Sequence, residues 1–350
     1  MIPNPTTGTL PSPGLRSRKP LIPMKAPAIC SVIAPEFIVQ FAIQHYGFST
    51  QTTCRLLKAG INHSYLINNG HDRFVLRVYY RSWRTELEIR EELRLLNYLK
   101  ENGIEVSYPI EDLDSKHIQY IDAVEGKRQA VLFSYAEGLS IKVPSEEVCY
   151  SLGLLMAKMH LLTIDMPLQR TCYDAETLAG WALKQAREFF DHGTPQMQYY
   201  ERATERIFRE FGLANHRSLR YGAVHIDLWY ENMKVANESD ICLFDFDNCG
   251  NGWLFLDIAY SIMLLFRNEP DKEEYRRKVK RFFEGYESIT PISDEEKRLL
   301  PFGGLAIWLH YNGVHVYRFN DFSNLFLSED FLEYWINTVD QWMAFNDVEI

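Results

Sequence analysis

The run His225-Ile226-Asp227-Leu228-Trp229-Tyr230-Glu231-Asn232 decides the fold of this chain, together with the shorter run Leu243-Phe244-Asp245-Phe246-Asp247 that follows it. As patterns, the first is H-x-D-x-x-x-x-N and the second is an apolar strand that ends in D-F-D. The first run offers a carboxylate (Asp227) and an amide oxygen (Asn232), and the strand after it offers a second carboxylate (Asp245). Such a set can take a proton from a hydroxyl group and hold Mg²⁺ on phosphate oxygens, which transfer of a phosphoryl group requires.

The spacing of these residues is that of a kinase catalytic loop and its metal-binding aspartate. We expect Asp227 to accept the proton of the attacking hydroxyl, or to orient that hydroxyl. His225 belongs to the same catalytic machinery, and we expect it to support the loop by hydrogen bonds rather than to shuttle protons. Asn232 and Asp245 are the predicted metal ligands, and Asp247 is either a further metal ligand or a turn residue. A lone H-x-D would more often be an ordinary loop, so the prediction rests on the whole set.

Asp257 lies in the run Phe255-Leu256-Asp257-Ile258-Ala259, at the start of an apolar segment. A carboxylate at this place either caps the N-terminus of a buried helix or braces the catalytic loop. The sequence leaves both roles open.

Charge and cysteine content exclude several classes of protein. The net charge of −10 over 350 residues argues against a nucleic-acid binder, which needs a basic face, and is weakly compatible with a cationic substrate. The six cysteines are scattered without a C-x-x-C pair, which is typical of free thiols in a reducing, cytoplasmic compartment. No apolar run reaches the length of a membrane span.

The chain divides into three parts. The first 23 residues hold six prolines and few large apolar side chains, so we expect residues 1–27 to form a disordered tail. Residues 28–137 are the predicted nucleotide-binding N-lobe, and residues 138–350 are the predicted C-lobe with the catalytic loop and the acceptor site.

Periodicity predicts a fold of the α+β class. In the N-lobe we expect helices at 35–46 and 85–100 and strands at 54–57, 64–67, 74–79, 117–121 and 130–133. This order is typical of a small lobe built on an antiparallel sheet. After Gly138 the pattern becomes mainly helical, at 146–162, 175–190, 197–211 and from 256 onward, interrupted by the catalytic segment at 221–247.

Arg77 lies in the centre of the strand at 74–79, where alternation alone would place it on a solvated face. The helix that follows changes this expectation, because Glu92 falls on its apolar stripe with Ile89, Leu93 and Leu96. An inward glutamate needs a partner. We therefore predict an ion pair between Arg77 and Glu92, with Arg77 in the place of the phosphate-binding lysine of kinases.

Two further segments are predicted to contact the nucleotide. The turn that holds Gly60, Asn62 and Ser64 lies between the first two strands and could cover phosphates with backbone N–H groups. Ser134 and Ala136 lie where the last N-lobe strand meets the lobe boundary, which suits a hinge whose backbone bonds adenine. A plain interdomain linker is the alternative for this second segment.

With these motifs, the chain resembles the aminoglycoside phosphotransferase/choline kinase superfamily from about Ala34 to its C-terminus, nearest to the branch of stress-response kinase A and type II homoserine kinase. The motifs that carry the resemblance are Val224 to Asn232, Asp245-Phe246-Asp247-Asn248-Cys249-Gly250 with Asp257-Ile258-Ala259, and Leu152-Gly153 with Ala157-Lys158-Met159-His160.

The resemblance implies a two-lobed protein-kinase-like fold, ATP and Mg²⁺ as cofactors, and transfer of phosphate to a hydroxyl. Two positions depart from the family's pattern. Ile226 stands where relatives usually have glycine, and Arg77 stands where lysine is common. Neither departure removes a group that the chemistry requires, so an active enzyme is expected.

The sequence leaves the identity of the phosphate acceptor open. A small, cationic metabolite or antibiotic is the leading hypothesis, a serine/threonine protein kinase of the stress-response kinase A type is the second, and a nucleotide-binding pseudokinase with a regulatory role is the third. We expect no nucleic-acid or membrane partner, and a monomer or homodimer. Candidates for the acceptor pocket are Tyr173, Asp174, Trp181, Trp229, Glu231, Trp308, His310, Tyr311 and His315, of which Trp308, Tyr311 and His315 have the helical spacing of a packed core stripe.

Overall fold

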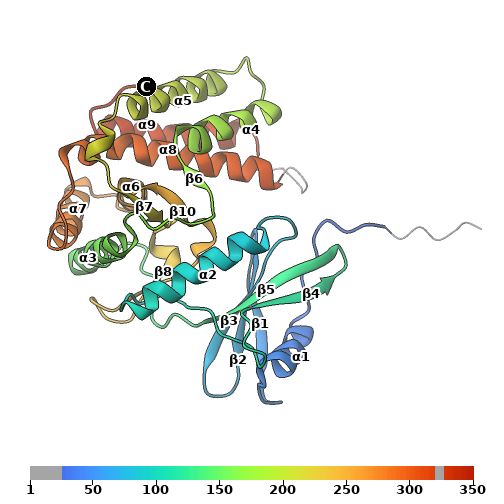
Figure 1. The fold of residues 1–350 in the computed structure, drawn as a ribbon. Coiled ribbons are helices and arrows are strands. Elements are labelled where there is room, and N and C mark those ends of the chain that lie inside the picture. Colours follow the sequence, from blue (N-terminus) through green and yellow to red (C-terminus); the bar gives the residue numbers. More distant parts are fainter. Residues whose placement is uncertain (1–25, 320–326) are drawn as a thin grey trace, which may run out of the picture.

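A computed structural model describes residues 26–319 and 327–350 and shows two lobes (Figure 1). The smaller lobe is an antiparallel sheet with strand order β1-β2-β3-β5-β4 and a helix on each side. Its elements are α1 (Pro35–Tyr46), β1 (Thr53–Ala59), β2 (His63–Asn68), β3 (Arg73–Val78), α2 (Glu86–Glu101), β4 (Ile118–Ala123) and β5 (Gly126–Ser134). The predicted fold class is therefore correct, and the predicted disordered tail lies almost entirely outside the described residues.

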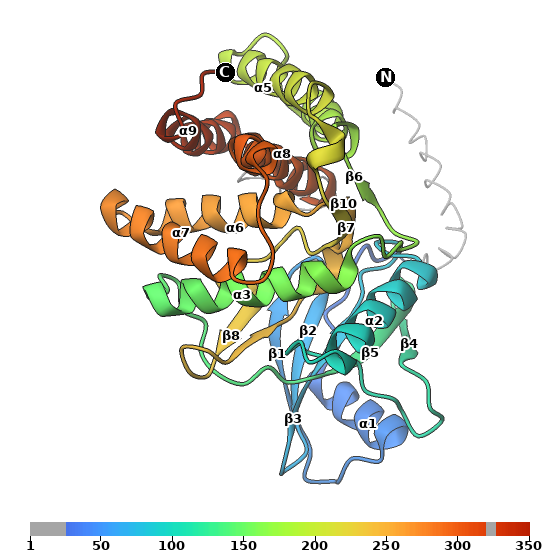
Figure 2. The same ribbon diagram turned by 60° about the vertical axis from the view of Figure 1, so that its left-hand side comes forward.

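The larger lobe is mainly helical, as predicted (Figures 1 and 2). Its helices are α3 (Glu146–Thr163), the π-helical turn η1 (Glu176–Gly180), α4 (Trp181–Phe189), α5 (Pro195–Gly212), α6 (Phe255–Asn268), α7 (Lys272–Glu287), α8 (Asp294–Phe319) and α9 (Glu329–Phe345), with short 3₁₀ turns η2 (His216–Ser218), η3 (Tyr230–Asn232) and η4 (Phe246–Asn248). Two small sheets lie among them, β6-β10-β7 and β8-β9. Their strands are β6 (Cys172–Tyr173), β7 (Tyr221–Val224), β8 (Met233–Val235), β9 (Ile241–Leu243) and β10 (Gly250–Trp253).

Two hydrophobic cores hold the molecule together. The smaller packs α1 against one face of the N-lobe sheet, through Ile38, Phe41 and Ala42. The larger joins Val131 and Phe133 of the small-lobe sheet to Ile89 and Leu93 of α2, and it continues through the C-lobe helices. Burial in a shared core therefore fixes α2 to both lobes, and the site lies where they meet.

Helices α3 and α7 approach each other closely because each carries a glycine at the contact. A Cβ atom on Gly153 would lie 2.0 Å from the Phe282 carbonyl oxygen, and one on Gly285 would lie 2.0 Å from that of Tyr150. The Leu152-Gly153 motif thus serves packing. Helix α3 also carries His160, whose Nε2 lies 3.1 Å from the Asp257 carboxylate.

Most predicted elements occur within a few residues of their expected bounds, with one difference in kind. The predicted helix at 175–190 begins as a π-helical turn and continues as α4. In the described part of the chain, no helix is long and apolar enough to cross a membrane.

Candidate active site

The predicted catalytic loop follows β7, and the His225 side chain supports it. This side chain is buried, and its ring accepts a hydrogen bond from the Asp227 backbone N–H at Nδ1, 3.2 Å away. The other ring nitrogen lies 3.2 Å from the Phe244 carbonyl oxygen, on the strand that leads to Asp245. His225 therefore joins the loop to the D-F-D segment, as expected of a supporting residue.

Asp257 braces the same loop, which decides between its two possible roles. Its carboxylate accepts hydrogen bonds from the backbone N–H groups of His225 (2.9 Å) and Ile226 (2.7 Å) and lies 3.1 Å from His160 Nε2. Burial alone would raise the pKa of Asp257, but the interactions with His160 and His225 outweigh burial and lower it. A buried carboxylate that stays ionised fixes the backbone on which Asp227 stands.

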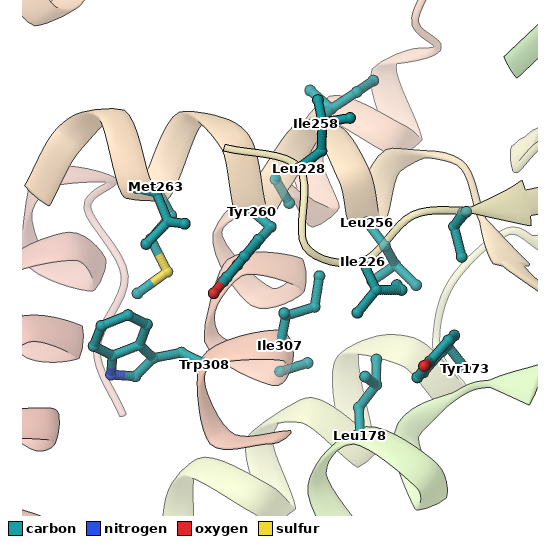
Figure 3. Packing of buried hydrophobic residues seen from close by; sticks show 14 of the residues in the cluster. Tyr173, Leu178, Ile226, Leu228, Leu256, Ile258, Tyr260, Met263, Ile307 and Trp308 are labelled. Carbon is teal, nitrogen blue, oxygen red and sulfur yellow. The ribbon is translucent and has the colours of Figure 1, made fainter. Parts of the chain in front are cut away.

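Ile226 takes the left-handed conformation, with φ of 67°, and its side chain is fully buried. Figure 3 shows Ile226 turned into the packed interior beside Leu256. A β-branched residue is rare in this region of backbone space, where glycine is unstrained. At Ile226 a buried apolar side chain thus stands on a glycine-like backbone conformation.

Asp227 and Asn232 lie side by side. The Asn232 amide nitrogen donates to the Asp227 carbonyl oxygen and to its carboxylate, both at 2.8 Å. Burial and the nearby Asp245 raise the pKa of Asp227 to about 8, against the lowering effect of hydrogen bonds from Asn232 and Tyr311. Asp227 is therefore oriented and has a high affinity for a proton, while the Asn232 oxygen is the atom left to face a cation.

The predicted ion pair between Arg77 and Glu92 is present. Arg77 Nη1 lies 2.7 Å from Glu92 Oε1, and Tyr79 donates to the other Glu92 oxygen at 3.1 Å. Arg77 also reaches across the lobes, because its Nη2 lies 3.0 Å from Asp245 Oδ1. Both members of the Arg77–Glu92 pair are buried, so the solvated-face alternative for Arg77 is excluded.

Asp245 and Asp247 have different surroundings, although they are two residues apart. The Asp245 side chain is 40% exposed. The Asp247 carboxylate is buried and accepts from Trp83 Nε1 at 2.7 Å and from Arg84 Nε at 3.4 Å. Burial would raise the pKa of Asp247, but Arg84 and Arg77 lower it. Protein donors thus occupy Asp247, whereas Asp245 opens toward a cavity.

That cavity, of about 430 Å³, lies between the lobes and has a size common for ligand sites. Its lining includes six of the predicted site residues: Ser64, Arg77, Glu92, Ala136, Asn232 and Asp245. Lys58 also lines the cavity and was not predicted; as a further cation beside Arg77 it suits phosphate groups.

Three predicted nucleotide-site residues do not line the cavity themselves. Gly60 and Asn62 form the adjoining turn, in which the Gly60 N–H donates to the Asn62 carbonyl oxygen at 3.2 Å. The Asn62 side chain accepts from the Tyr80 N–H at 3.0 Å and so anchors the turn to the end of β3. The Ser134 hydroxyl accepts from the Tyr108 N–H at 3.0 Å, so it holds the hinge segment rather than facing the cavity.

The candidates for the acceptor pocket separate into several groups. Trp308 is buried and donates to the Trp335 carbonyl oxygen, as expected of a core residue, and the His315 ring lies 2.6 Å from the Tyr311 carbonyl oxygen of its own helix. Asp174 bonds Thr177 at the start of η1. Glu231 lines the interlobe cavity instead, and Trp229 packs on Tyr230.

Tyr173, Trp181, His310 and Tyr311 form one aromatic cluster above the D-F-D segment. Tyr173 and Trp181 both contact the His310 ring, and Tyr311 stacks on Tyr260 at 5.4 Å between ring centroids. Tyr173 donates to the Asn248 carbonyl oxygen, and the Asn248 amide donates to the Tyr311 hydroxyl. Within this cluster, Tyr311 is the residue that interacts with Asp227.

Sequence reasoning missed the arginines that surround Asp247. Arg84 binds Asp247 and Asn248, and Arg170 donates to backbone oxygens of Glu88, Asp247 and Cys249. Their only signal in the sequence is a Trp-Arg pair just before a helix and an isolated arginine. Neither pattern reveals a partner so far along the chain.

Comparisons with known proteins place the chain among phosphotransferases. The family described as "Phosphotransferase enzyme family" matches residues 53–292. An uncharacterised protein of Deinococcus radiodurans is 30% identical over 90% of this chain and 92% of its own length, and a homoserine kinase of Methylobacillus glycogenes is 27% identical over 73% and 77%. Among solved structures, amicoumacin kinase in complex with AMP-PNP, Ca²⁺ and Ami has a TM-score of 0.71 at 19% identity, covering 88% of this chain and 92% of that one.

Proposed function

We propose that this chain, which belongs to the phosphotransferase enzyme family and is a kinase with an alcohol group as acceptor, uses ATP and a small, amine-bearing molecule. In this proposal the γ-phosphate of ATP passes to a hydroxyl of that molecule. The observation that carries the proposal is the cavity in which Arg77, paired with Glu92, meets Asp245 and Asn232 from the other lobe. Cations from one lobe and oxygen ligands from the other are what a nucleoside triphosphate with a bound metal requires.

The residues of the small lobe would hold ATP. Arg77 is kept in place by Glu92 and offers its guanidinium to the phosphates, and Lys58 adds a further positive charge. The turn at Gly60 and Asn62 would cover the phosphates with backbone N–H groups. The hinge near Ala136 would take the adenine.

Asn232 and Asp245 fit a Mg²⁺ ion. Both present oxygen atoms, both line the same cavity, and Mg²⁺ in phosphate-transfer sites uses one or two protein ligands and completes its shell with phosphate oxygens and water. When bound, Mg²⁺ would neutralise the developing charge on the phosphates. We assign Asp247 to the structure of the site rather than to the metal, because Trp83 and Arg84 use its carboxylate.

Asp227 would handle the proton. As the acceptor oxygen forms a bond to the γ-phosphorus and the bond to the β-phosphate oxygen breaks, the hydroxyl proton passes to the Asp227 carboxylate. Asn232 orients that carboxylate, and His225 and Asp257 fix the loop that carries it.

A small acceptor is favoured by the short connection after the D-F-D segment. Residues 248–254 hold the end of η4 and the strand β10 before α6 begins, so this stretch offers no long segment on which a protein substrate could dock. The homoserine kinase relative and the amicoumacin kinase structure support a small-molecule acceptor, and the net charge of −10 is compatible with an amine.

The proposal is tested by measuring ADP release from Mg-ATP with homoserine, choline, ethanolamine, aminoglycosides, sugars and a generic protein substrate. Asp227→Asn should lower kcat for any active acceptor by about 10² or more while ATP binding persists, because the base is lost and the cavity is not. Asp245→Asn should weaken ATP binding in the presence of Mg²⁺ and change it little in its absence. Turnover that persists in Asp227→Asn would refute the assignment of the base, and ATP binding without turnover on any acceptor would favour the pseudokinase hypothesis.

A further inference from the structure

Trp83 and Arg84, in the connection between β3 and α2, form a clamp on the large lobe. Trp83 donates to Asp247 Oδ2 at 2.7 Å, and Arg84 reaches Asp247 Oδ1 at 3.4 Å and Asn248 Oδ1 at 2.8 Å. The Arg84 side chain is only 11% exposed, and its guanidinium lies 4.9 Å from the centre of the Trp83 ring. A buried guanidinium with two hydrogen-bonded partners on the opposite lobe is a directional contact, not a solvated surface pair.

The contacts continue beyond Asn248. With its oxygen bound to Arg84, the Asn248 side chain donates through its nitrogen to the Tyr311 hydroxyl, 3.1 Å away. Its backbone oxygen accepts from Tyr173 at 2.6 Å, so the residue is held from two sides. An amide whose oxygen and nitrogen both have partners has one orientation, so Asn248 links Arg84 to Tyr311 in a fixed geometry.

Tyr311 stands next to the catalytic base. Its ring stacks on Tyr260 with an angle of 24° between the planes, and hydrogen bonding by its hydroxyl lowers the pKa of the Asp227 carboxylate. Asn232, within the same loop, donates to that carboxylate at 2.8 Å, and the Tyr311 hydroxyl on α8 is its second polar contact. The second contact is the end of a chain that begins in the nucleotide-binding lobe.

We propose that Arg84 is a positioning residue for phosphoryl transfer, acting through Asn248 and Tyr311 to set the Asp227 carboxylate when the two lobes are docked. The inference rests on the proposed function of Asp227. It assigns a role to the connection between β3 and α2: the lobe that holds ATP also orients the base in the other lobe. The base would then be aligned only when the small lobe is in place.

The chain offers a matched control. Arg94, on α2, also contacts the large lobe, where it donates to the Pro167 carbonyl oxygen at 2.8 Å, but this contact does not lead to Tyr311. Arg84→Ala removes the contacts of an arginine with Asp247 and Asn248, and Arg94→Ala removes the contact of an arginine with Pro167. Only the first should disturb the base.

One measurement needs no acceptor. With 3-fluorotyrosine in the full chain, the ¹⁹F resonance of Tyr311 is identified by its loss in Tyr311→Phe. Arg84→Ala should shift or broaden this resonance, and Arg94→Ala should leave it in place. A Tyr311 resonance that does not respond to Arg84→Ala overturns the inference, whatever the acceptor is.

The second measurement is kinetic and uses Mg-ATP with an acceptor active in the ADP-release screen. Arg84→Ala and Tyr311→Phe should each lower kcat about 10-fold, with less than about a 3-fold change in KM for ATP, and the double variant should be no slower than the worse single one. If the fold-losses in kcat of the two single variants multiply in the double variant, or if only KM for ATP changes, the coupling is refuted.

If no acceptor is found, the proposed function fails, and the ¹⁹F result still decides whether Arg84 acts on Tyr311. Thermal unfolding identifies a variant that has lost its fold, and Tyr311→Phe, which keeps the stacked ring, guards against that outcome.

Discussion

At the scale of single residues, Ile226 has two opposing effects on the stability of the fold, one from its backbone conformation and one from the burial of its side chain. Its left-handed backbone costs about 1–2 kcal/mol relative to glycine, whereas burial of its side chain contributes more, since truncation of a buried isoleucine to alanine costs about 2–5 kcal/mol. Ile226→Gly should therefore destabilise the protein. It should do so by about 1 kcal/mol less than Ile226→Ala, because alanine loses the same packing and keeps the strain.

The order of these two variants is the informative result, because glycine is ordinarily the less stable of the pair outside the left-handed region. Urea unfolding of both variants, with equal slopes against denaturant concentration, gives the comparison. An alanine variant as stable as the glycine variant, or more so, would show that Ile226 is not strained.

Single residues also show which contacts of the site could be predicted from the sequence and which could not. The spacing of His225, Asp227, Asn232 and Asp245 predicted a set of side chains that the structure does bring together, because short loops between strands leave little freedom. The surroundings of Asp247 could not be predicted. Its partners, Trp83 and Arg84, lie more than 160 positions away in the chain, and nothing in the local pattern of either segment names the other.

At the scale of elements, α2 carries two buried glutamates, Glu91 and Glu92, and Glu92 is the one that pairs with Arg77. Glu92→Gln should lower the unfolding free energy by about 3–5 kcal/mol, because Arg77 would then be buried opposite a neutral partner. It should also raise KM for ATP, since Arg77 loses the contact that aims it at the cavity. Chemical denaturation and ATP titration measure the two effects.

Glu86 on the same helix is the control for that variant. Its side chain is 40% exposed and pairs with Arg90, so Glu86→Gln should change stability by less than about 1 kcal/mol and leave ATP binding unchanged. Equal effects of the two substitutions would show that the Arg77–Glu92 pair has no special part in the site.

The elements themselves were predictable where a periodic pattern was strong. The stripe of Ile89, Leu93 and Leu96 predicted both the helix and its buried face, and Glu92 followed from that face. The strand β10 was not predicted, because Gly250-Asn251-Gly252-Trp253 has neither alternation nor β-branched residues; pairing with β6 and β7 makes it a strand.

At the scale of the whole molecule, buried histidines in both lobes should make the protein sensitive to acid. Burial, followed by Arg128 and Arg318, lowers the pKa of His63 to about 4, and burial lowers that of His310 on α8 to about 4. The pKa values of His225 and His315 are also lowered, first by burial. Between the ordinary value of 6.5 and about 4, the unfolded chain binds protons that the folded protein does not, so stability falls as the pH falls through this window.

His310→Asn tests this at one position. The His310 ring lies 3.3 Å from the Thr177 carbonyl oxygen, and an asparagine amide can donate there without titrating. One histidine held neutral in the folded protein contributes about 1.4 kcal/mol per pH unit to the slope of the unfolding free energy against pH. Between pH 6 and pH 5, the slope of the variant should therefore be shallower than that of the natural protein by about 1 kcal/mol per pH unit. The slope is the decisive quantity, since a change in packing alone would shift the free energy equally at both pH values. Urea unfolding at each pH measures it, and a variant whose slope equals that of the natural protein would show that His310 titrates alike in the folded and unfolded chains.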